Sequence, residues 1–280
     1  MIVDAHQHFW NLETGAYSWP TPDLATLYRT FAPEDLAPEL AAAGVDRTVV
    51  VQADDSFWET DAMLAHADAH DFIAGVVGWV PLDRPEEAAE ALDRYTRHPK
   101  FAGVRHLIHT EPDPDWLVQD PVLEGLGLLA EAGVPFDVVS LLPRHLEHVV
   151  TIAERHPTLN VVIDHLSKPR IAARELEPWA SLLRAAAECP NVFAKVSGLV
   201  TEADHDSWTV EDLRPYVEHA VGVFGADRLM FGSDWPVALL AADYQTVFTV
   251  YAALLGGIDQ DKVLGGNAAR FYGFSEISGG

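Results

Sequence analysis

The chain of 280 residues carries 43 acidic and 18 basic side chains, a formal net charge of −25. This charge argues against nucleic acid and an anionic membrane surface as partners. The only cysteine, Cys189, excludes an intramolecular disulfide framework and is expected to be a buried spectator. The apolar runs are short and the first residues lack a basic region before a long apolar stretch, so we expect no membrane span, no signal peptide and a cytoplasmic location.

Short runs rich in Val, Ile, Phe and Leu alternate along the chain with longer, alanine-rich amphipathic stretches. Nearly continuous apolar runs are typical of parallel strands that are buried on both faces. The predicted strands are residues 2–9, 46–52, 72–80, 101–108, 134–140, 160–166, 191–198 and 228–234. The predicted helices are residues 34–44, 59–70, 84–98, a stretch ending at Gly133, 143–157, 177–189, 209–225 and 243–257, with a short helix within 261–274.

Eight repeats of strand and helix predict an α/β fold, a (β/α)8 barrel of the TIM type that spans residues 1–280 as one domain. An open, doubly wound sheet is the alternative. Such a sheet more often has a glycine-rich phosphate loop after its first strand, whereas here the first strand ends in histidines. The segments 10–32 and 109–118 are rich in Pro and Trp and are expected to be loops at the active-site end.

Polar side chains gather at the carboxyl ends of the predicted strands, where barrels of this type carry their active sites. His6 and His8 are two positions apart on a strand, so both side chains lie on the same face and can serve one metal ion or one substrate. Asp234 is the last residue of the last predicted strand and is a candidate metal ligand or general base. Ser233 lacks the GxSxG context of a nucleophilic serine.

Further polar and aromatic residues at this end are candidates for substrate binding. Arg105 and Lys195 lie within strands, where they either pair with a buried carboxylate or hold the substrate. The full set of candidates for substrate contacts is Arg105, His106, Lys195, Trp10, Trp235 and His109. The histidines of helical or loop segments are expected to be solvated: His66, His70, His98, His145, His148, His156, His205 and His219.

Five motifs follow one another in order from residue 4 to residue 237: DAHQHFW, GVRHLIH with EPDPDW after it, VIDHLSKP, KVSGLVTEAD and FGSDWPV. Together they resemble the amidohydrolase superfamily, in its amidohydrolase-2 branch of sugar-lactone and related lactone hydrolases. The resemblance implies a distorted α/β barrel and hydrolysis of a cyclic ester such as an aldonolactone. It also implies that His6 and His8 are the strand-one pair, His165 the strand-six histidine and Asp234 the strand-eight base.

One departure from the family pattern bears on metal binding. Metal-dependent members often carry a histidine at the end of strand five, where this chain has Asp137. A strong binuclear site is therefore not expected. A single divalent ion, zinc or manganese, could bind to His6, His8 and Asp234, and the sequence leaves open whether a metal is needed. No organic cofactor is expected.

The expected mechanism starts with Asp234, which takes a proton from water so that hydroxide attacks the lactone carbonyl. His6, His8 and a metal, if present, stabilise the oxyanion, with Lys195 or His106 as further candidates, and Asp234 or His165 returns the proton. A metal-dependent decarboxylase of small aromatic acids and a non-catalytic binding barrel are the alternatives. The missing strand-five histidine argues against the first, and the complete set His6, His8, His165 and Asp234 argues against the second. The particular lactone, the oligomeric state and the roles of Asp137 and the loop 53–59 are left open.

Overall fold

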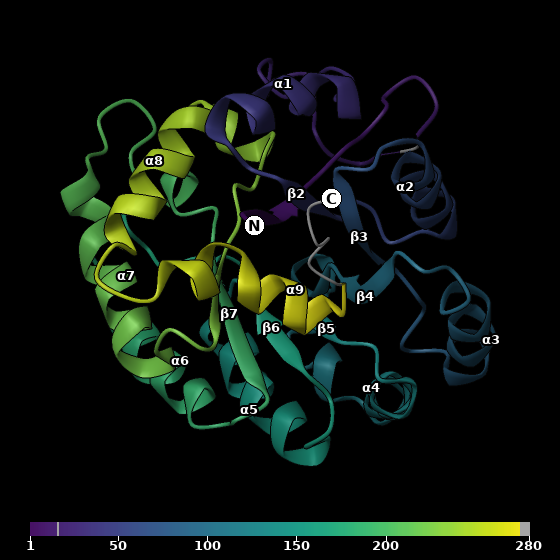
Figure 1. Cartoon of the computed structure of the whole chain (residues 1–280). Helices are drawn as coiled ribbons and strands as arrows, with labels where there is room; N and C mark the ends of the chain where they lie inside the picture. Colours follow the sequence, from purple (N-terminus) through teal and green to yellow (C-terminus); the bar gives the residue numbers. More distant parts are fainter. Residues whose placement is uncertain (16, 275–280) are drawn as a thin grey trace.

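The computed structural model describes residues 1–15 and 17–274 and shows eight parallel strands paired in chain order (Figure 1). The strands are β1 (Val3–Gln7), β2 (Arg47–Val51), β3 (Ile73–Gly78), β4 (Phe101–His106), β5 (Phe136–Val138), β6 (Val161–Ile163), β7 (Val192–Val196) and β8 (Leu229–Phe231). All eight predicted strands are confirmed. The β/α barrel predicted from the sequence is therefore the observed fold.

A helix follows each strand, and the helices surround the barrel (Figure 1). They are α1 (Pro33–Ala43), α2 (Phe57–Ala69), α3 (Pro85–Tyr95), α4 (Asp120–Ala132), α5 (Pro143–Arg155), α6 (Trp179–Ala187), α7 (Val210–Phe224), α8 (Tyr244–Leu254) and α9 (Asn267–Tyr272). Gly44 and Gly133 end α1 and α4 in the left-handed conformation, as the predicted helix ends require. No helix of the described residues is long and apolar enough to cross a membrane.

Two apolar clusters build the core. The larger one lies between the outer face of the strands and the helices, and it includes the buried Cys189. The smaller one joins valines of β2, β3 and β6 to Ala268, Phe271 and Tyr272 of α9. Figure 1 shows α9 crossing one end of the barrel, so this last helix closes that end.

Hydrogen bonds between β1 and the residues after β8 close the barrel. The amide of Asp234 donates to the carbonyl of His6 at 2.8 Å, and the amide of His8 donates to the carbonyl of Trp235 at 2.7 Å. The carboxylate of Asp4 accepts from the amide of Ser233 at 2.8 Å. We call these three bonds the β1–β8 seam. It fixes the backbone of the first and last predicted site residues relative to each other.

Candidate active site

Three imidazoles surround the carboxylate of Asp234. The Nε2 atom of His8 lies 3.4 Å from Asp234 Oδ1, and those of His6 and His165 each lie 3.8 Å from the same oxygen. All four side chains are almost fully buried. The structure therefore brings together the four residues that the sequence singled out for catalysis.

His6 and His8 point to the same place because the strand alternation puts them on one face. Their Nε2 atoms are 3.1 Å apart. The Nδ1 of His8 lies 2.7 Å from the carbonyl oxygen of Val51, which can only accept a hydrogen bond. Nδ1 of His8 therefore carries the proton, and its Nε2 offers a lone pair toward Asp234 and His6.

His165 reaches the site from an unusual backbone turn. His165, Leu166, Ser167 and Lys168 all have left-handed φ values, of 53°, 49°, 62° and 48°. Such a run of L-residues costs about 1–2 kcal/mol per residue, so surrounding contacts must hold it. Trp179 donates to the carbonyl of Leu166 at 2.6 Å, and the hydroxyls of Ser140 and Ser167 are 2.7 Å apart. Ser197 Oγ lies 2.9 Å from Nδ1 of His165 and orients its ring.

Burial and charge set opposite protonation preferences in the site. Burial lowers the pKa of His6 well below its ordinary value, lowers that of His8, and lowers that of His165 to about 4. Burial would raise the pKa of Asp234, but the imidazoles of His165, His8 and His6 outweigh it and hold this pKa well below the usual range. Asp234 is therefore a carboxylate among neutral imidazoles at neutral pH.

A second group of charges lies directly beneath His6. The Nδ1 atom of His6 is 3.2 Å from Asp164 Oδ1 and 3.1 Å from the ammonium of Lys195. Arg105 Nη1 pairs with Asp164 at 3.1 Å, and its Nη2 donates to the carbonyl of Gln52. Asp164 was not among the predicted site residues, because two adjacent polar residues at a strand end do not reveal which of them faces the barrel.

Arg105 and Lys195 are thus both paired with buried carboxylates, the structural alternative considered from the sequence. Lys195 is fully buried, and its charge is accounted for by Asp137 at 2.6 Å and Asp164 at 3.0 Å. These contacts give no support to the expectation that Lys195 holds the substrate. Arg105 Nη1 lies 3.4 Å from His6 Nε2, so it borders the three imidazoles.

His106 belongs to a polar and aromatic wall at the end of β4. The indole N–H of Trp79 donates to its Nδ1 at 3.0 Å, so its Nε2 carries a proton and donates to Glu111 at 2.8 Å. The ring also stacks on Trp116, with centroids 3.9 Å apart. Asp55, from the loop 53–59, lies 3.5 Å from the same Nε2. Neighbouring groups therefore fix the orientation and tautomer of His106.

The remaining candidates for substrate contacts are His109, Trp10 and Trp235. His109 is exposed in a 3-10 turn, Ile108–Thr110. Trp10 is buried, donates to the carbonyl of Arg29 at 2.8 Å and packs on Phe31. Trp235 is buried as well and also packs on Phe31. Both tryptophans form an aromatic cluster behind the β1–β8 seam, and their contact with substrate stays a prediction.

Two histidines that were expected to be solvated are buried instead. His145 and His148 are only 2% and 4% exposed. His148 Nε2 lies 2.8 Å from Asp115 Oδ1. His145 Nδ1 accepts from the amides of Leu141 and Leu142 at 3.3 and 3.4 Å, at the start of α5. The expectation was wrong because these residues serve a helix start and a loop contact that the helical pattern does not reveal.

The donor set of the site suits a divalent metal ion. Ligand atoms of His6, His8 and Asp234 all lie within 4.8 Å of one another, and those of His6, Asp164 and His165 form a second such group. Imidazole nitrogen and carboxylate oxygen are ordinary zinc ligands, and Nε2 of His8 already has its lone pair directed inward. The hydrogen-bonded far side of His8 is the support that metal-binding histidines usually have.

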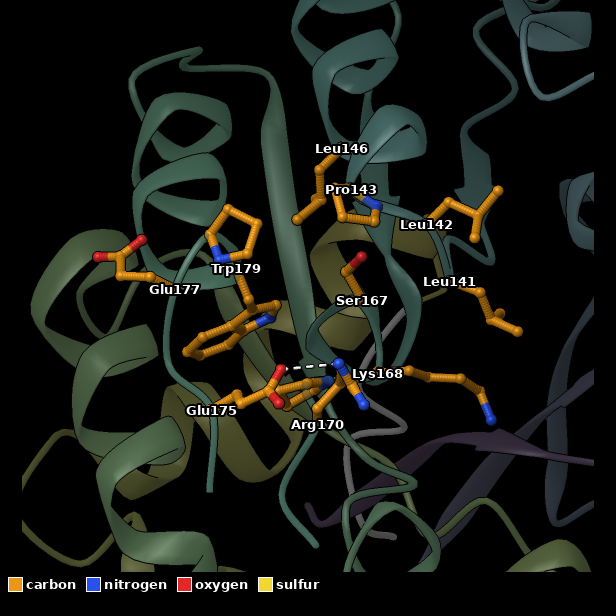
Figure 2. A pocket seen from close by; sticks show the side chains of 12 residues that line it. Leu141, Leu142, Pro143, Leu146, Ser167, Lys168, Arg170, Glu175, Glu177 and Trp179 are labelled. Carbon is orange, nitrogen blue, oxygen red and sulfur yellow. Dashed lines mark hydrogen bonds and ion pairs between the residues drawn. The ribbon is translucent and has the colours of Figure 1, made fainter. Parts of the chain in front are cut away.

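A hollow of about 280 Å³ lies beside this site, between the loops that follow β5 and β6 (Figure 2). Its wall is largely apolar, with Leu142, Pro143, Leu146 and Trp179. Arg170 and Glu175, which are 2.8 Å apart, lie at its edge, and Lys168 points away from the apolar wall in Figure 2. None of the three imidazoles and Asp234 lines the hollow, so it is separate from the candidate active site.

The fold and the His-x-His, His and Asp set define an α/β-barrel protein of the amidohydrolase type. Residues 3–274 match the model of the family described as "Amidohydrolase", and the chain belongs to this family.

Similar proteins extend over the whole chain. It is 40% identical to an L-fucono-1,5-lactonase of Burkholderia ambifaria, over 99% of this chain and 97% of that protein. It is 35% identical to an L-fucono-1,5-lactonase of Burkholderia multivorans, over 98% and 96%. The crystal structure of an amidohydrolase from Burkholderia multivorans with bound zinc has a TM-score of 0.91 at 34% identity, covering 98% of this chain and 100% of that one. Family, donor set and this zinc-bound neighbour together indicate a site for a divalent metal.

Proposed function

We propose that the protein is a lactonase that hydrolyses a neutral sugar lactone, with L-fucono-1,5-lactone as the first candidate substrate. The observation that carries the proposal is the carboxylate of Asp234 within 3.4–3.8 Å of three buried imidazoles. This arrangement occurs in a chain that is 40% identical, over nearly its whole length, to an L-fucono-1,5-lactonase.

Asp234 is the base of the proposed reaction. It accepts a proton from water as the water oxygen attacks the lactone carbonyl, and a tetrahedral oxyanion forms. The guanidinium of Arg105 lies 3.4 Å from Nε2 of His6 and supplies positive charge beside the position proposed for this oxyanion. The proton held by Asp234 then passes to the ring oxygen as the ester bond breaks, directly or through His165, and the open hydroxy acid leaves.

The low pKa of Asp234 bears on this step. A carboxylate that is held well below its usual pKa is a weak base toward bulk water, because efficient proton transfer needs similar pKa values. A divalent ion held by His6, His8 and Asp234 would acidify the attacking water and polarise the carbonyl when bound. We propose zinc or manganese as this ion, since both accept nitrogen and oxygen ligands.

The wall around His106 supports a neutral, hydroxyl-rich substrate. Glu111 and Asp55 are partly exposed there and offer carboxylate oxygens, which accept hydrogen bonds from sugar hydroxyls and repel a carboxylated lactone. Trp10, Trp235 and His109 are proposed as more distant contacts on the same side of the barrel.

The test is a pH-indicator assay of purified protein on a panel of sugar 1,4- and 1,5-lactones, with and without a chelator. We expect acid release on L-fucono-1,5-lactone or a stereoisomer. Loss of the rate with chelator, and its recovery with zinc or manganese, would support the metal. A folded protein that is silent on the whole panel in the presence of both metals contradicts the proposed function.

A further inference from the structure

The ammonium of Lys195 occupies a position with the surroundings of a bound metal ion. Three donor atoms surround Nζ: Asp137 Oδ2 of β5 at 2.6 Å, Asp164 Oδ1 directly after β6 at 3.0 Å and His6 Nδ1 of β1 at 3.1 Å. All of these side chains are fully buried. Two carboxylate oxygens and one imidazole nitrogen are a common donor set for a divalent cation.

Each of the two carboxylates has a further partner besides Lys195. Tyr272 donates to Asp137 at 2.7 Å, and Arg105 pairs with Asp164 at 3.1 Å. Oδ1 of Asp137 is buried and has no hydrogen-bond partner among the residues of the described structure, so this carboxylate has acceptor capacity to spare.

The position of Lys195 adjoins one of the two possible metal clusters but not the other. The group His6, Asp164 and His165 shares His6 and Asp164 with the surroundings of Nζ, so an ion there would lie against the ammonium and be repelled. The group His6, His8 and Asp234 uses the opposite nitrogen of the His6 ring, which faces the barrel mouth.

We propose that Lys195 is a built-in cation that fills the second cation position of this barrel, so that the chain binds a single divalent ion at His6, His8 and Asp234. The inference rests on the proposed function in so far as that function includes the divalent ion. Lys195 is a positioning residue: it neutralises Asp137 and Asp164 and lies against the Nδ1 side of the His6 ring, 3.1 Å from that atom. Removing its side chain leaves Asp137 and Asp164 around an empty position, which a divalent ion can enter, with Nδ1 of His6 as a third ligand once the ring has released its proton to solvent and bridges the two ions.

The test counts metal ions. Wild type and Lys195→Ala are saturated with zinc or cobalt, freed of excess ion and analysed by atomic emission. We expect one ion per wild-type chain and two per Lys195→Ala chain. With cobalt, the Lys195→Ala protein should show a second set of visible absorption bands. The double variant Lys195→Met/Asp137→Asn is the matched control: it has lost the lysine and one ligand and keeps one ion.

Each other outcome contradicts the inference. Two ions per wild-type chain show that Lys195 fills no cation position. A Lys195→Ala chain that still binds one ion, or that stays unfolded at every zinc concentration, shows that a divalent ion cannot replace the ammonium. The metal counts do not depend on lactone turnover. The counts can therefore contradict the inference about Lys195 while the lactone assay supports the proposed function, and the lactone assay can fail while the counts support the inference.

Chemical rescue gives a second measurement. Propylammonium has the shape and charge of the deleted part of the side chain, whereas 1-propanol has nearly the same shape without charge. We expect propylammonium to raise the turnover of Lys195→Ala at least tenfold. We expect 1-propanol to change this turnover little. Equal rescue by both compounds would show that Lys195 acts by filling space.

Discussion

A Cβ atom at Gly198 would lie 2.6 Å from Nδ1 of His165 and 2.9 Å from Oδ2 of Asp234. Gly198 follows β7 and has φ = 61°, in the left-handed region. The glycine therefore serves two purposes, because it permits the turn and lets two site side chains pack directly against the backbone.

We expect Gly198→Ala to lower kcat of lactone hydrolysis at least a hundredfold, since both His165 and Asp234 must move. Gly133→Ala is the matched control, because Gly133 has φ = 68° but a Cβ atom there would meet no other atom within 4 Å. Both variants should lose about 1–2 kcal/mol of stability through backbone strain, and only Gly198→Ala should lose activity. Equal activities in the two variants would show that the close approach at Gly198 does not matter for the site. Turnover and thermal unfolding measure the two effects.

Replacing the proposed base should separate activity from folding. Asp234→Asn keeps the size of the side chain but cannot take the proton, so kcat should fall roughly 10²–10⁴-fold. The melting temperature should change little, and Asp206→Asn, on an exposed aspartate, should behave as wild type. The assignment of Asp234 is wrong if purified Asp234→Asn keeps wild-type turnover.

Glu59, in the first turn of α2, makes the stability of the protein depend on pH. Burial raises the pKa of its carboxyl from 4.5 to about 8, although it accepts from the amides of Ala53 and Asp54. The folded chain thus holds this proton more tightly than the unfolded chain. Its contribution to stability is fully present below pH 4.5 and is lost as pH rises toward about 8.

The corresponding experiment compares Glu59→Gln with wild type by urea unfolding between about pH 5 and pH 9. The amide is neutral at every pH. The free energy of unfolding of the variant, relative to that of wild type, should therefore increase by a few kcal/mol as pH rises. Glu86→Gln replaces an exposed glutamate in the first turn of α3. The difference in free energy of unfolding between this variant and wild type should not change with pH. A constant difference between Glu59→Gln and wild type would contradict the raised pKa.

Trp79 should influence substrate binding through His106. Trp79→Phe keeps an aromatic ring but removes the N–H that fixes the tautomer of His106. A lost hydrogen bond is worth about 0.5–1.5 kcal/mol, so KM should rise roughly threefold to tenfold with kcat nearly unchanged. Trp58→Phe, at an exposed tryptophan, should leave KM as in wild type. A fall in kcat alone would place His106 in the chemical step.

Local sequence pattern was sufficient to predict the strands and the proximity of His6, His8 and Asp234, whose roles stay a prediction. The period of two on β1 placed His6 beside His8, and the position of Asp234 after the last strand placed it near both. These predictions depend only on which residues lie at the carboxyl ends of the strands, because every barrel of this type brings those ends together.

The charges beneath His6 could not be predicted in the same way. Tyr272 lies in the last helix and contacts Asp137 of β5 only because α9 closes one end of the barrel. Likewise, Asp164 and His165 share a strand end, and the left-handed turn that directs the histidine toward Asp234 has no glycine to signal it. Such contacts depend on tertiary packing rather than on local pattern.

The bonds of the β1–β8 seam can form only after the last strand of the barrel has joined the first. Asp234 and His6 come from opposite ends of the chain, and the backbone bond between them forms only when the eighth strand joins the first. A chain that ends before residue 228, through incomplete synthesis or cleavage, still contains the residues of seven strands and the three site histidines. It lacks Asp234, so these histidines have no base beside them. We therefore expect activity to arise only when the barrel closes, so that it can serve as a reporter of complete folding.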